Sequence, residues 1–277
     1  MTGSFLIGLI GEGIQGSRSP DMHQREADRQ GLRLIYQRID LKVLGLGVEA
    51  LPDLLLSAER MGFAGLNITF PAKQAVIPLL TELSDEARAI GAVNTVVLKD
   101  GRRVGHNTDA YGFAEGLRRG LPNAPMERVV QLGAGGAGAA TSYTLLKLGV
   151  ANLAIHDPDL GRAGGLAGRL AAQFPGAQVS AVTDVEAAVR AAQGLVNATP
   201  IGMYGHPGLP LPAELLRPDL WVADVVYVPP VTELLSAARA IGAPTVSGVG
   251  MAVFQAVKAF ELFSGHAADG EGMLAAF

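Results

Sequence analysis

The segment VVQLGAGGAG, residues 129–138, decides the fold of the second half of this chain. Its glycines follow the pattern G-x-G-x-x-G directly after a short apolar run that indicates a strand. The first glycine permits a sharp turn, the second lets the backbone approach a pyrophosphate, and the third allows strand and helix to pack closely. A helix that begins here directs its first N–H groups at the phosphates. The segment therefore predicts a dinucleotide site formed by Gly133, Ala134, Gly135, Gly136, Ala137 and Gly138.

An acidic residue follows this motif at the spacing that such sites use. Asp157 ends the next predicted strand, 19 residues after Gly138. A carboxylate there accepts hydrogen bonds from the ribose hydroxyls of NAD and repels the 2′-phosphate of NADP. Two other readings stay open: Asp157 and Asp159 can simply form the turn and cap the next helix, and Arg162 can swing toward a phosphate. We expect NAD as the cofactor, with NADP as a weaker alternative.

Short apolar strands alternate with helical patterns along most of the chain, which is typical of βαβ units in a mainly parallel sheet. In the first half we expect strands over 5–11, 34–40 and 65–69, and helices over 20–31, 47–62, 72–80 and 85–91. The turn KDGR connects two further strands, over 94–98 and 103–106, and predicts a hairpin.

A second α/β series begins near Ala110, where we place a domain boundary. We expect its strands over 129–132, 152–156, 178–182, 194–198 and 221–226 and near Thr245, and its helices from the glycine turn to about 149 and over 162–174, 185–192, 232–241 and 251–263. The last helix carries Val253, Val257, Phe260 and Phe263 at helical spacing, which predicts a buried face. It follows the final strand of the second sheet, so we expect it to pack onto the first domain.

The composition excludes several classes of protein. Apolar residues make up 49% of the 277 residues and charged residues 17%, which fits a globular α/β enzyme. The net charge of −4, without a basic run, disfavours nucleic acid as a partner. The chain has no cysteine, which removes thiol catalysis and disulfides, and its five histidines show no metal-binding spacing, so we expect no metal. The apolar run near the N-terminus is too short to span a membrane, and we expect a cytoplasmic protein.

Polar residues gather at the ends of the predicted strands in the first half. They are Ser17 and Ser19 after the first strand, Asn67, Thr69 and Lys73 around the end of the third, and Asn94, Asn107 and Asp109 around the hairpin. Hydroxyls, amides and one lysine suit a small polyhydroxylated acid. Each residue alone has a plainer interpretation: Ser19 before Pro20 can be a helix cap, Asn94 a turn residue and Lys73 a solvated side chain.

The same segments, in this order, resemble the shikimate/quinate dehydrogenase family over nearly the whole chain. SRSPDMH, GLNITFPAK, GAVNT and HNTDAYG are similar to its substrate-side signatures, and NATPIGM and GVGMAVFQAVKAFELFSG are similar to its nicotinamide-side loop and closing helix. The resemblance assigns Lys73 and Asp109 to a catalytic pair. It assigns the substrate to Ser17, Ser19, Thr69, Asn94, Tyr227 and Gln255. It assigns the nicotinamide side of the cofactor to Asn197, Thr199, Gly248 and Met251.

The resemblance implies an α/β fold with an N-terminal substrate-binding domain and a Rossmann dinucleotide-binding domain. The first would comprise 1–109 and 245–277, including the returning C-terminal helix, and the second 110–244. The implied reaction is reversible hydride transfer between shikimate and 3-dehydroshikimate, or between quinate and 3-dehydroquinate. The implied assembly is a monomer or homodimer.

Two departures from the family pattern bear on specificity. HDPD (residues 156–159) stands where many NADP-dependent members carry an Asn-Arg-Thr type segment, and Gly16 stands where the common pattern has histidine. Both resemble the branch that uses NAD and accepts quinate. Three alternatives remain open: quinate as the main substrate, a non-catalytic NAD-binding sensor, and a folate-linked methylene dehydrogenase of related plan.

Overall fold

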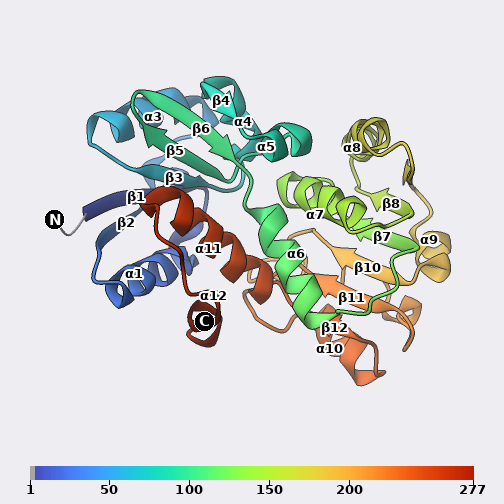
Figure 1. Ribbon diagram of the computed structural model, residues 1–277. Coiled ribbons are helices and arrows are strands. Elements are labelled where there is room, and N and C mark those ends of the chain that lie inside the picture. Colours follow the sequence, from blue (N-terminus) through green and yellow to red (C-terminus); the bar gives the residue numbers. More distant parts are fainter. Residues whose placement is uncertain (1–3) are drawn as a thin grey trace. The chain divides into compact units, whose positions relative to one another are not determined.

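The computed structural model describes residues 4–277, which form two compact units (Figure 1). Unit 1 extends through Thr108 and resumes with Val253–Phe277, and unit 2 is Asp109–Ala252. The C-terminal helix from Val253 onward belongs to unit 1, where its position beyond the last strand placed it in the sequence analysis. The two units differ in detail from the expected domains, because residue 109 begins a helix of unit 2, residues 245–246 extend the sheet of unit 2, and unit 2 runs to residue 252.

Unit 1 is built on a six-stranded sheet in the order β2-β1-β3-β5-β6-β4. Its strands are β1 (Ser4–Gly11), β2 (Arg33–Asp40), β3 (Gly65–Ile68), β4 (Glu82–Leu83), β5 (Thr95–Lys99) and β6 (Arg102–His106). Strand β5 runs antiparallel to both of its neighbours, and the other pairs are parallel. The sheet is therefore mainly parallel, as predicted, and the carboxyl ends of β1 and β3 lie at one edge.

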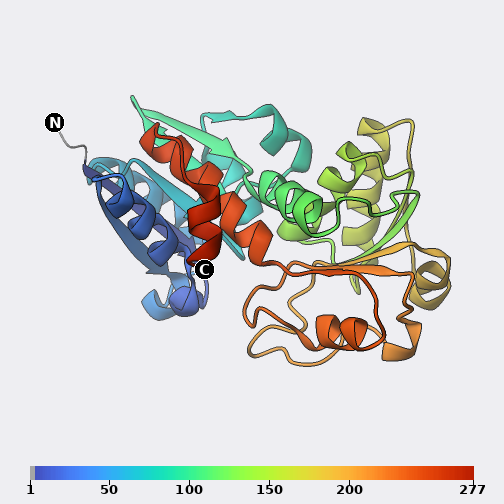
Figure 2. The same ribbon diagram turned by 60° about the horizontal axis from the view of Figure 1, so that its bottom comes forward.

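Helices cover both faces of this sheet. They are α1 (Ser19–Arg29), α2 (Leu41–Leu44), α3 (Leu51–Arg60), α4 (Ala72–Ala75), α5 (Asp85–Ile90), α11 (Val249–Ser264) and α12 (Gly270–Ala275), with short 3-10 turns η1 (Ile14–Gly16), η2 (Val48–Ala50) and η3 (Ile77–Leu79). Successive residues of β1 point to opposite faces. Ile10 packs with α3 and α4 residues, whereas Ile7 and Leu9 pack with Ala259 and Phe263 of α11. Both views show α1 and α11 side by side (Figures 1 and 2).

Prolines and glycines explain where unit 1 departs from the predicted elements. The helix expected over 72–80 ends early, because Pro78 offers no N–H for a continued helix and a 3-10 turn follows instead. The helix expected over 47–62 begins only at Leu51, with Pro52 in its first turn. The predicted hairpin is confirmed with a tighter turn, in which Asp100 and Gly101 both have positive φ, as a two-residue type I′ turn requires.

Unit 2 is a parallel six-stranded sheet in the order β12-β11-β10-β7-β8-β9. Its strands are β7 (Arg128–Leu132), β8 (Asn152–His156), β9 (Gln178–Ala181), β10 (Gly194–Asn197), β11 (Trp221–Asp224) and β12 (Thr245–Val246). Its helices are α6 (Asp109–Gly120), α7 (Gly136–Lys147), α8 (Leu160–Gln173), α9 (Val185–Ala191) and α10 (Glu233–Ala240), with η4 (Ala213–Leu215). The chain leaves β7 in one direction and returns to β10 on its other side, which creates a crevice at their carboxyl ends.

A large aromatic residue is buried in strand β11 of this second sheet. Trp221 is fully buried, and its ring lies where a side chain on the paired residue Gly194 would stand. Its indole N–H donates to the carbonyl oxygen of Pro125 at 3.0 Å, so the buried ring leaves no polar atom unsatisfied. Beside it, Leu195 and Val222 pack against the helices α9 and α10.

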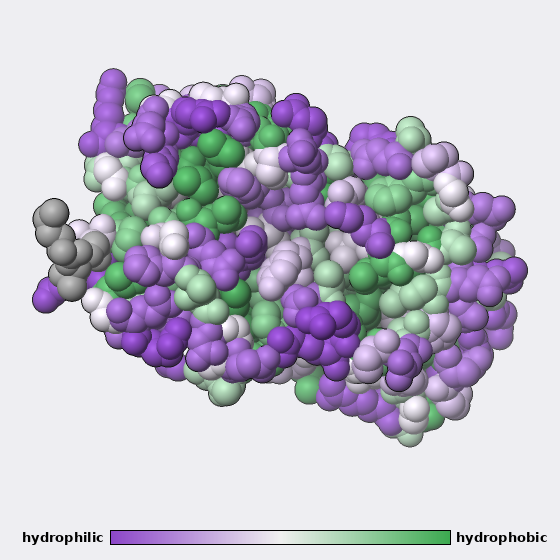
Figure 3. Space-filling view, viewed as in Figure 1, coloured by the Kyte–Doolittle hydropathy of each residue, from purple (hydrophilic) through white to green (hydrophobic). Residues whose placement is uncertain are grey.

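The described part of the chain contains no helix that is long and apolar enough to cross a membrane. On the face seen in Figure 3, hydrophilic side chains cover much of the surface and smaller hydrophobic patches lie between them.

Candidate functional site

The glycine-rich turn of unit 2 has the geometry of a pyrophosphate cradle. Gly133 has φ of 97°, and a Cβ there would lie 2.7 Å from the carbonyl oxygen of Ala198. A Cβ on Gly138 would lie 2.3 Å from the carbonyl oxygen of Gly133. A Cβ on Gly135, in contrast, would meet no atom of the described chain within 4 Å. Two of the glycines are thus required by the protein, and the third leaves open space where a ligand can approach, so the residues fit a dinucleotide.

A buried glutamine that the sequence analysis missed forms hydrogen bonds with the backbone of this turn. Gln131 is fully buried on β7, and its Nε2 donates to the carbonyl oxygens of Gly133 and Gly138, both at 2.9 Å. Its Oε1 accepts a hydrogen bond from Thr141 on α7. No side chain caps the start of α7, which leaves the helix N-terminus as the feature that faces an incoming anion. A lone glutamine inside an apolar strand was the available signal.

The carboxylate of Asp157 is bound to the cradle itself. Its Oδ2 accepts the N–H of Ala134 at 2.8 Å, and its Oδ1 accepts the N–H of Asp159 at 2.9 Å. Asp159 in turn caps α8 through the N–H of Arg162. The guanidinium of Arg162 lies 3.8 Å from Asp157 and is more than half exposed. The geometry is therefore compatible with each role considered for this segment: Asp157 in the turn, Asp159 as the helix cap and Arg162 as a nearby cation.

The space above Gly135 makes a sharp prediction. Gly135→Ala keeps an ordinary backbone conformation (φ −75°) and meets no protein atom, so the variant is expected to melt at the wild-type temperature. Because the added methyl group occupies the approach of the pyrophosphate, the KM for the nicotinamide cofactor should rise by about tenfold or more. Thermal melting and initial-rate kinetics measure the two quantities.

Gly168→Ala is the matched control, because Gly168 is an exposed residue of α8 whose Cβ also meets nothing. It should stabilise the protein by about 0.4–1 kcal/mol and leave the KM unchanged. An unchanged cofactor KM in Gly135→Ala would place the pyrophosphate elsewhere.

The loop after β10 is shaped by a buried polar network. Oδ1 of Asn197 accepts the N–H and the hydroxyl of Thr199, while its Nδ2 donates to the carbonyl oxygen of Ile201 and to Asp224. Asp224 also accepts from Thr232 at 2.7 Å. Burial raises the pKa of Asp224, and the hydrogen bonds that it accepts oppose this rise. Asn197 is fully buried with both amide hydrogens used, so it supports the loop from inside.

The remaining predicted residues of unit 2 lie at the start of α11, after β11 and at the start of α6. A Cβ on Gly248 would lie 2.2 Å from the carbonyl oxygen of Val225, so only glycine fits where the two segments touch. Met251 is buried one turn later, and Tyr227 is half-buried after β11. Asp109 is the buried first residue of α6 and therefore also belongs to unit 2.

In unit 1, the loop that carries the two predicted serines is held by strand β2. The hydroxyl of Ser17 lies 3.3 Å from that of Ser19 and accepts the N–H of Ser19. From β2, Arg38 donates to the carbonyl oxygen of Ser17 at 3.0 Å, and Asp40 accepts the N–H groups of Gly13 and Ile14. Although burial opposes it, these and further hydrogen bonds hold the pKa of Asp40 below its usual range. The serine pair is thus built as a fixed group.

Thr69 and Lys73 follow the end of β3 on the same edge of the sheet. Gly11 ends β1 beside them, and a Cβ there would overlap the methyl group of Thr69. The N–H of Thr69 donates to Ile10, and the carbonyl oxygen of Lys73 accepts the N–H of Val93 at 2.9 Å. Both side chains are half-buried. The backbone therefore brings the segments of Thr69, Lys73 and Asn94 together, because Asn94 precedes the antiparallel strand β5 and so lies at the edge where β3 ends.

Asn94 lies at the centre of a buried polar network. Its Oδ1 accepts the N–H of Thr108 at 2.8 Å, and its Nδ2 donates to the hydroxyl of Thr108 at 2.9 Å and lies 3.5 Å from Oε1 of Gln255. Thr95 connects Asn94 to Asn67, which accepts a hydrogen bond from the hydroxyl of Tyr36 at 2.9 Å. Gln255 of α11 and Asn94 are thus neighbours, although 161 residues separate them in sequence.

The predicted site residues are divided between the two units. Unit 1 contains Ser17, Ser19, Thr69, Lys73, Asn94 and Gln255, whereas unit 2 contains Asp109, Tyr227 and the predicted cofactor residues. The sequence analysis missed Tyr36, Arg38, Asp40, Thr95 and Thr108. The alternation of polar residues at 36, 38 and 40 along one strand was a signal for three of them.

Comparison with known proteins gives the same result over the full length. The family model for the shikimate dehydrogenase substrate binding domain matches residues 9–96. The chain is 55% identical to a shikimate dehydrogenase (NADP(+)) of Streptomyces avermitilis, covering 98% of this chain and 94% of the relative. It is 50% identical to a quinate/shikimate dehydrogenase (NAD(+)) of Corynebacterium efficiens, covering 99% and 98%. Quinate dehydrogenase from Corynebacterium glutamicum in complex with NAD superposes with a TM-score of 0.91 at 47% identity, covering 98% of both chains.

The parallel sheet with its glycine cradle fits a dinucleotide, and the relatives that match over the full length are dehydrogenases, so the chain is an NAD(P)-dependent oxidoreductase. The chain belongs to the shikimate/quinate dehydrogenase family.

Proposed function

We propose that this protein oxidises a ring hydroxyl of shikimate, and of quinate as a second substrate, with reduction of NAD. The observation that carries the proposal is that unit 1 contains both the fixed serine pair and the Asn94–Gln255 network. Relatives at 50–55% identity are named for shikimate or for both acids, which supports the same substrate class here.

Each polar group has a role that its surroundings support. The hydroxyls of Ser17 and Ser19 donate to the substrate carboxylate and fix which ring hydroxyl is presented for reaction. Thr69, Asn94, Gln255 and Tyr227 bind the other hydroxyls. Lys73 accepts the proton that the reacting hydroxyl loses and returns it in the reverse direction. Asp109 accepts a hydrogen bond from the same hydroxyl.

The unit 2 residues bind the cofactor. The cradle Gly133–Gly138 and the N-terminus of α7 bind the pyrophosphate. Thr199, Gly248 and Met251 border the nicotinamide, and Asn197 supports the loop that carries Thr199. When bound, the nicotinamide ring accepts the hydride from the ring carbon of the substrate.

A matrix of shikimate and quinate against NAD and NADP, followed at the absorbance of the reduced nicotinamide, tests the proposal. We expect turnover with both acids and higher kcat/KM for shikimate with NAD. Higher kcat/KM for quinate would reverse the substrate order. Cofactor binding without turnover of either acid would identify a sensor instead of an enzyme.

The preference for NAD rests on the charge of Asp157. Asp157→Ser should raise the ratio of kcat/KM for NADP to that for NAD by about tenfold, because it removes the carboxylate that repels the 2′-phosphate. It should also lower kcat/KM for NAD, because the loop loses the hydrogen bond to Ala134. Asp157→Asn is the matched control: it removes the charge and keeps an oxygen for Ala134, and it gives up only the hydrogen bond from the N–H of Asp159, so the ratio should rise with less loss for NAD. An unchanged ratio in both variants would contradict the assignment.

A further inference from the structure

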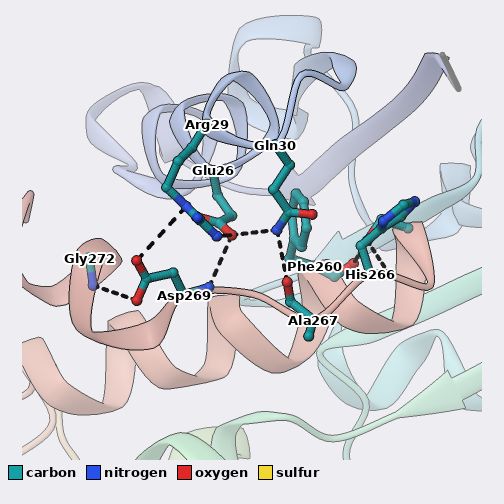
Figure 4. Close-up of polar contacts among 9 residues, drawn as sticks. Glu26, Arg29, Gln30, Phe260, His266, Ala267, Asp269 and Gly272 are labelled. Atoms are coloured by element: carbon teal, nitrogen blue, oxygen red, sulfur yellow. Dashed lines mark hydrogen bonds and ion pairs between the residues drawn. The ribbon is translucent and has the colours of Figure 1, made fainter.

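The segment after α11 packs along α1 and is anchored at one end by a buried carboxylate (Figure 4). Glu26 accepts hydrogen bonds from Arg29 at 2.8 and 2.7 Å, from Gln30 at 2.6 Å and from the N–H of Asp269 at 3.0 Å. Gln30 also donates to the carbonyl oxygen of Ala267 at 2.8 Å. Burial opposes ionisation of Glu26, but these donors hold its pKa below the usual range. The end of α1 is thereby tied to the start of α12, which Asp269 caps.

The other end of the same segment is bound to the start of α1. Nη2 of Arg18 donates to the main-chain oxygen of Phe277 at 2.9 Å, and its guanidinium lies 4.8 Å from the centre of the Phe277 ring. Arg25 makes only a long, exposed contact of 3.4 Å with Ala276. Between the two ends lies a cavity of about 130 Å³, lined in part by Met22 and Met273. These hydrogen bonds thus lie at the two ends of the segment, with the cavity between them.

The end at Phe277 is joined to the serine pair by a single residue. Arg18 stands between Ser17 and Ser19 in the sequence, and the hydroxyls of these two serines are hydrogen-bonded to each other. Arg38 fixes Ser17 from β2, so the loop is held from the sheet on one side and from Phe277 on the other. The contacts of the guanidinium with Phe277 oppose movement of the loop away from the C-terminal segment.

We propose that Phe277 and Arg18 are positioning residues, which act through the Ser17–Ser19 loop to set the affinity for the substrate carboxylate. The proposal rests on the proposed function, in which the two serines bind that carboxylate. Releasing this end of the segment should weaken substrate binding and leave the chemical step and the cofactor unaffected.

A double-mutant cycle in the full-length protein tests this link. Phe277→Ala removes the ring, and Arg18→Gln removes the guanidinium. We expect each to raise the KM for shikimate by about tenfold, with kcat and the cofactor KM within about twofold of wild type. If Arg18 acts through Phe277, the double variant is no worse than the poorer single variant. A KM unchanged in Phe277→Ala, or effects that multiply in the double variant, would overturn the proposal.

Two further variants separate positioning from folding and from charge. Arg18→Lys keeps the positive charge but loses the planar guanidinium that both donates to Phe277 and lies over its ring, so it should reproduce the increase in KM even where Phe277→Ala fails to fold. Glu26→Gln loosens only the far end, so it should lower the melting temperature and leave the KM near wild type. A higher KM in Glu26→Gln alone would show general loosening of α1 instead.

Ser17→Ala distinguishes failure of this inference from failure of the proposed function. If it leaves the KM for shikimate unchanged, the serines do not bind the substrate and the proposed role of the loop is wrong. If it raises the KM while Phe277→Ala and Arg18→Lys do not, the proposed function stands and only the role of Phe277 is lost.

Discussion

Lys73→Met is expected to lower kcat for shikimate oxidation by about two to four orders of magnitude, the usual contribution of general acid–base catalysis. Methionine keeps the aliphatic length of lysine but has no Nζ to accept the proton of the reacting hydroxyl. The carbonyl oxygen of residue 73 still accepts the N–H of Val93, so the fold at this point is retained. Because Lys73 acts on the reacting group, the KM for shikimate should change much less than kcat.

Lys99→Met is the matched control, because Lys99 is an exposed lysine at the end of β5. It removes the same charge and should leave both constants unchanged. Full activity in Lys73→Met, measured by steady-state kinetics at several pH values, would remove Lys73 from the mechanism. Asp109→Asn should give a smaller loss, because an amide oxygen can still accept a hydrogen bond from the substrate.

Acidification is expected to destabilise the protein through His23. This residue of α1 is fully buried, with its ring 5.2 Å from Tyr36 and 6.1 Å from both Phe260 and Phe263. Neither ring nitrogen has a hydrogen-bond partner among residues 4–277. Burial lowers the pKa of His23 to about 3, so the folded protein keeps it neutral. Below pH 6.5 the unfolded chain binds a proton that the folded chain does not, so stability falls as the pH falls.

For one such proton the free energy of unfolding decreases by about 2 kcal/mol between neutral pH and pH 5. His23→Leu removes this dependence and should leave the stability at pH 7 equal or higher, because an unsatisfied buried polar group is lost. Urea unfolding at pH 7, 6 and 5 measures the difference. His266→Gln, at an exposed histidine, should show the wild-type slope. Equal slopes in wild type and His23→Leu would refute the role of His23.

The sequence predicted best those elements that end at a glycine-containing turn or carry apolar residues at regular spacing over several turns of helix. The strand before Gly133, the hairpin at Asp100 and the buried face of α11 are of this kind, and the structure confirms each. Helix α12 was missed because it is six residues long and includes Gly270 and Gly272, which disfavour a helix by themselves. The residues that flank it, Asp269 and Phe277, contact Glu26 and Arg18 from distant parts of the chain, and no local pattern contains these contacts.

The site shows the same division. The residue types at the ends of strands were predictable, because parallel sheets bind ligands at that edge. Their partners were not, because Tyr36 reaches Asn67 across the intervening strand β1, and Gln255 reaches Asn94 from a distant helix. Sheet order and helix docking, rather than spacing in the sequence, decide these pairs. The interior position of Asn197 was also beyond reach, because the sequence does not show which way the last residue of a strand points.

The bond between Asp157 and Ala134 has an evolutionary consequence. The same carboxylate is expected to favour NAD over NADP and also accepts a hydrogen bond that stabilises the glycine turn. A lineage that changes this residue to admit NADP therefore loses order in the cradle at the same step. We expect cofactor exchange in close relatives to proceed through paired substitutions, in which a second residue restores the bond to the turn before or together with the loss of the charge. Reconstructed intermediates between NAD-using and NADP-using relatives, assayed with both cofactors, would reveal such coupling as epistasis between position 157 and the glycine turn.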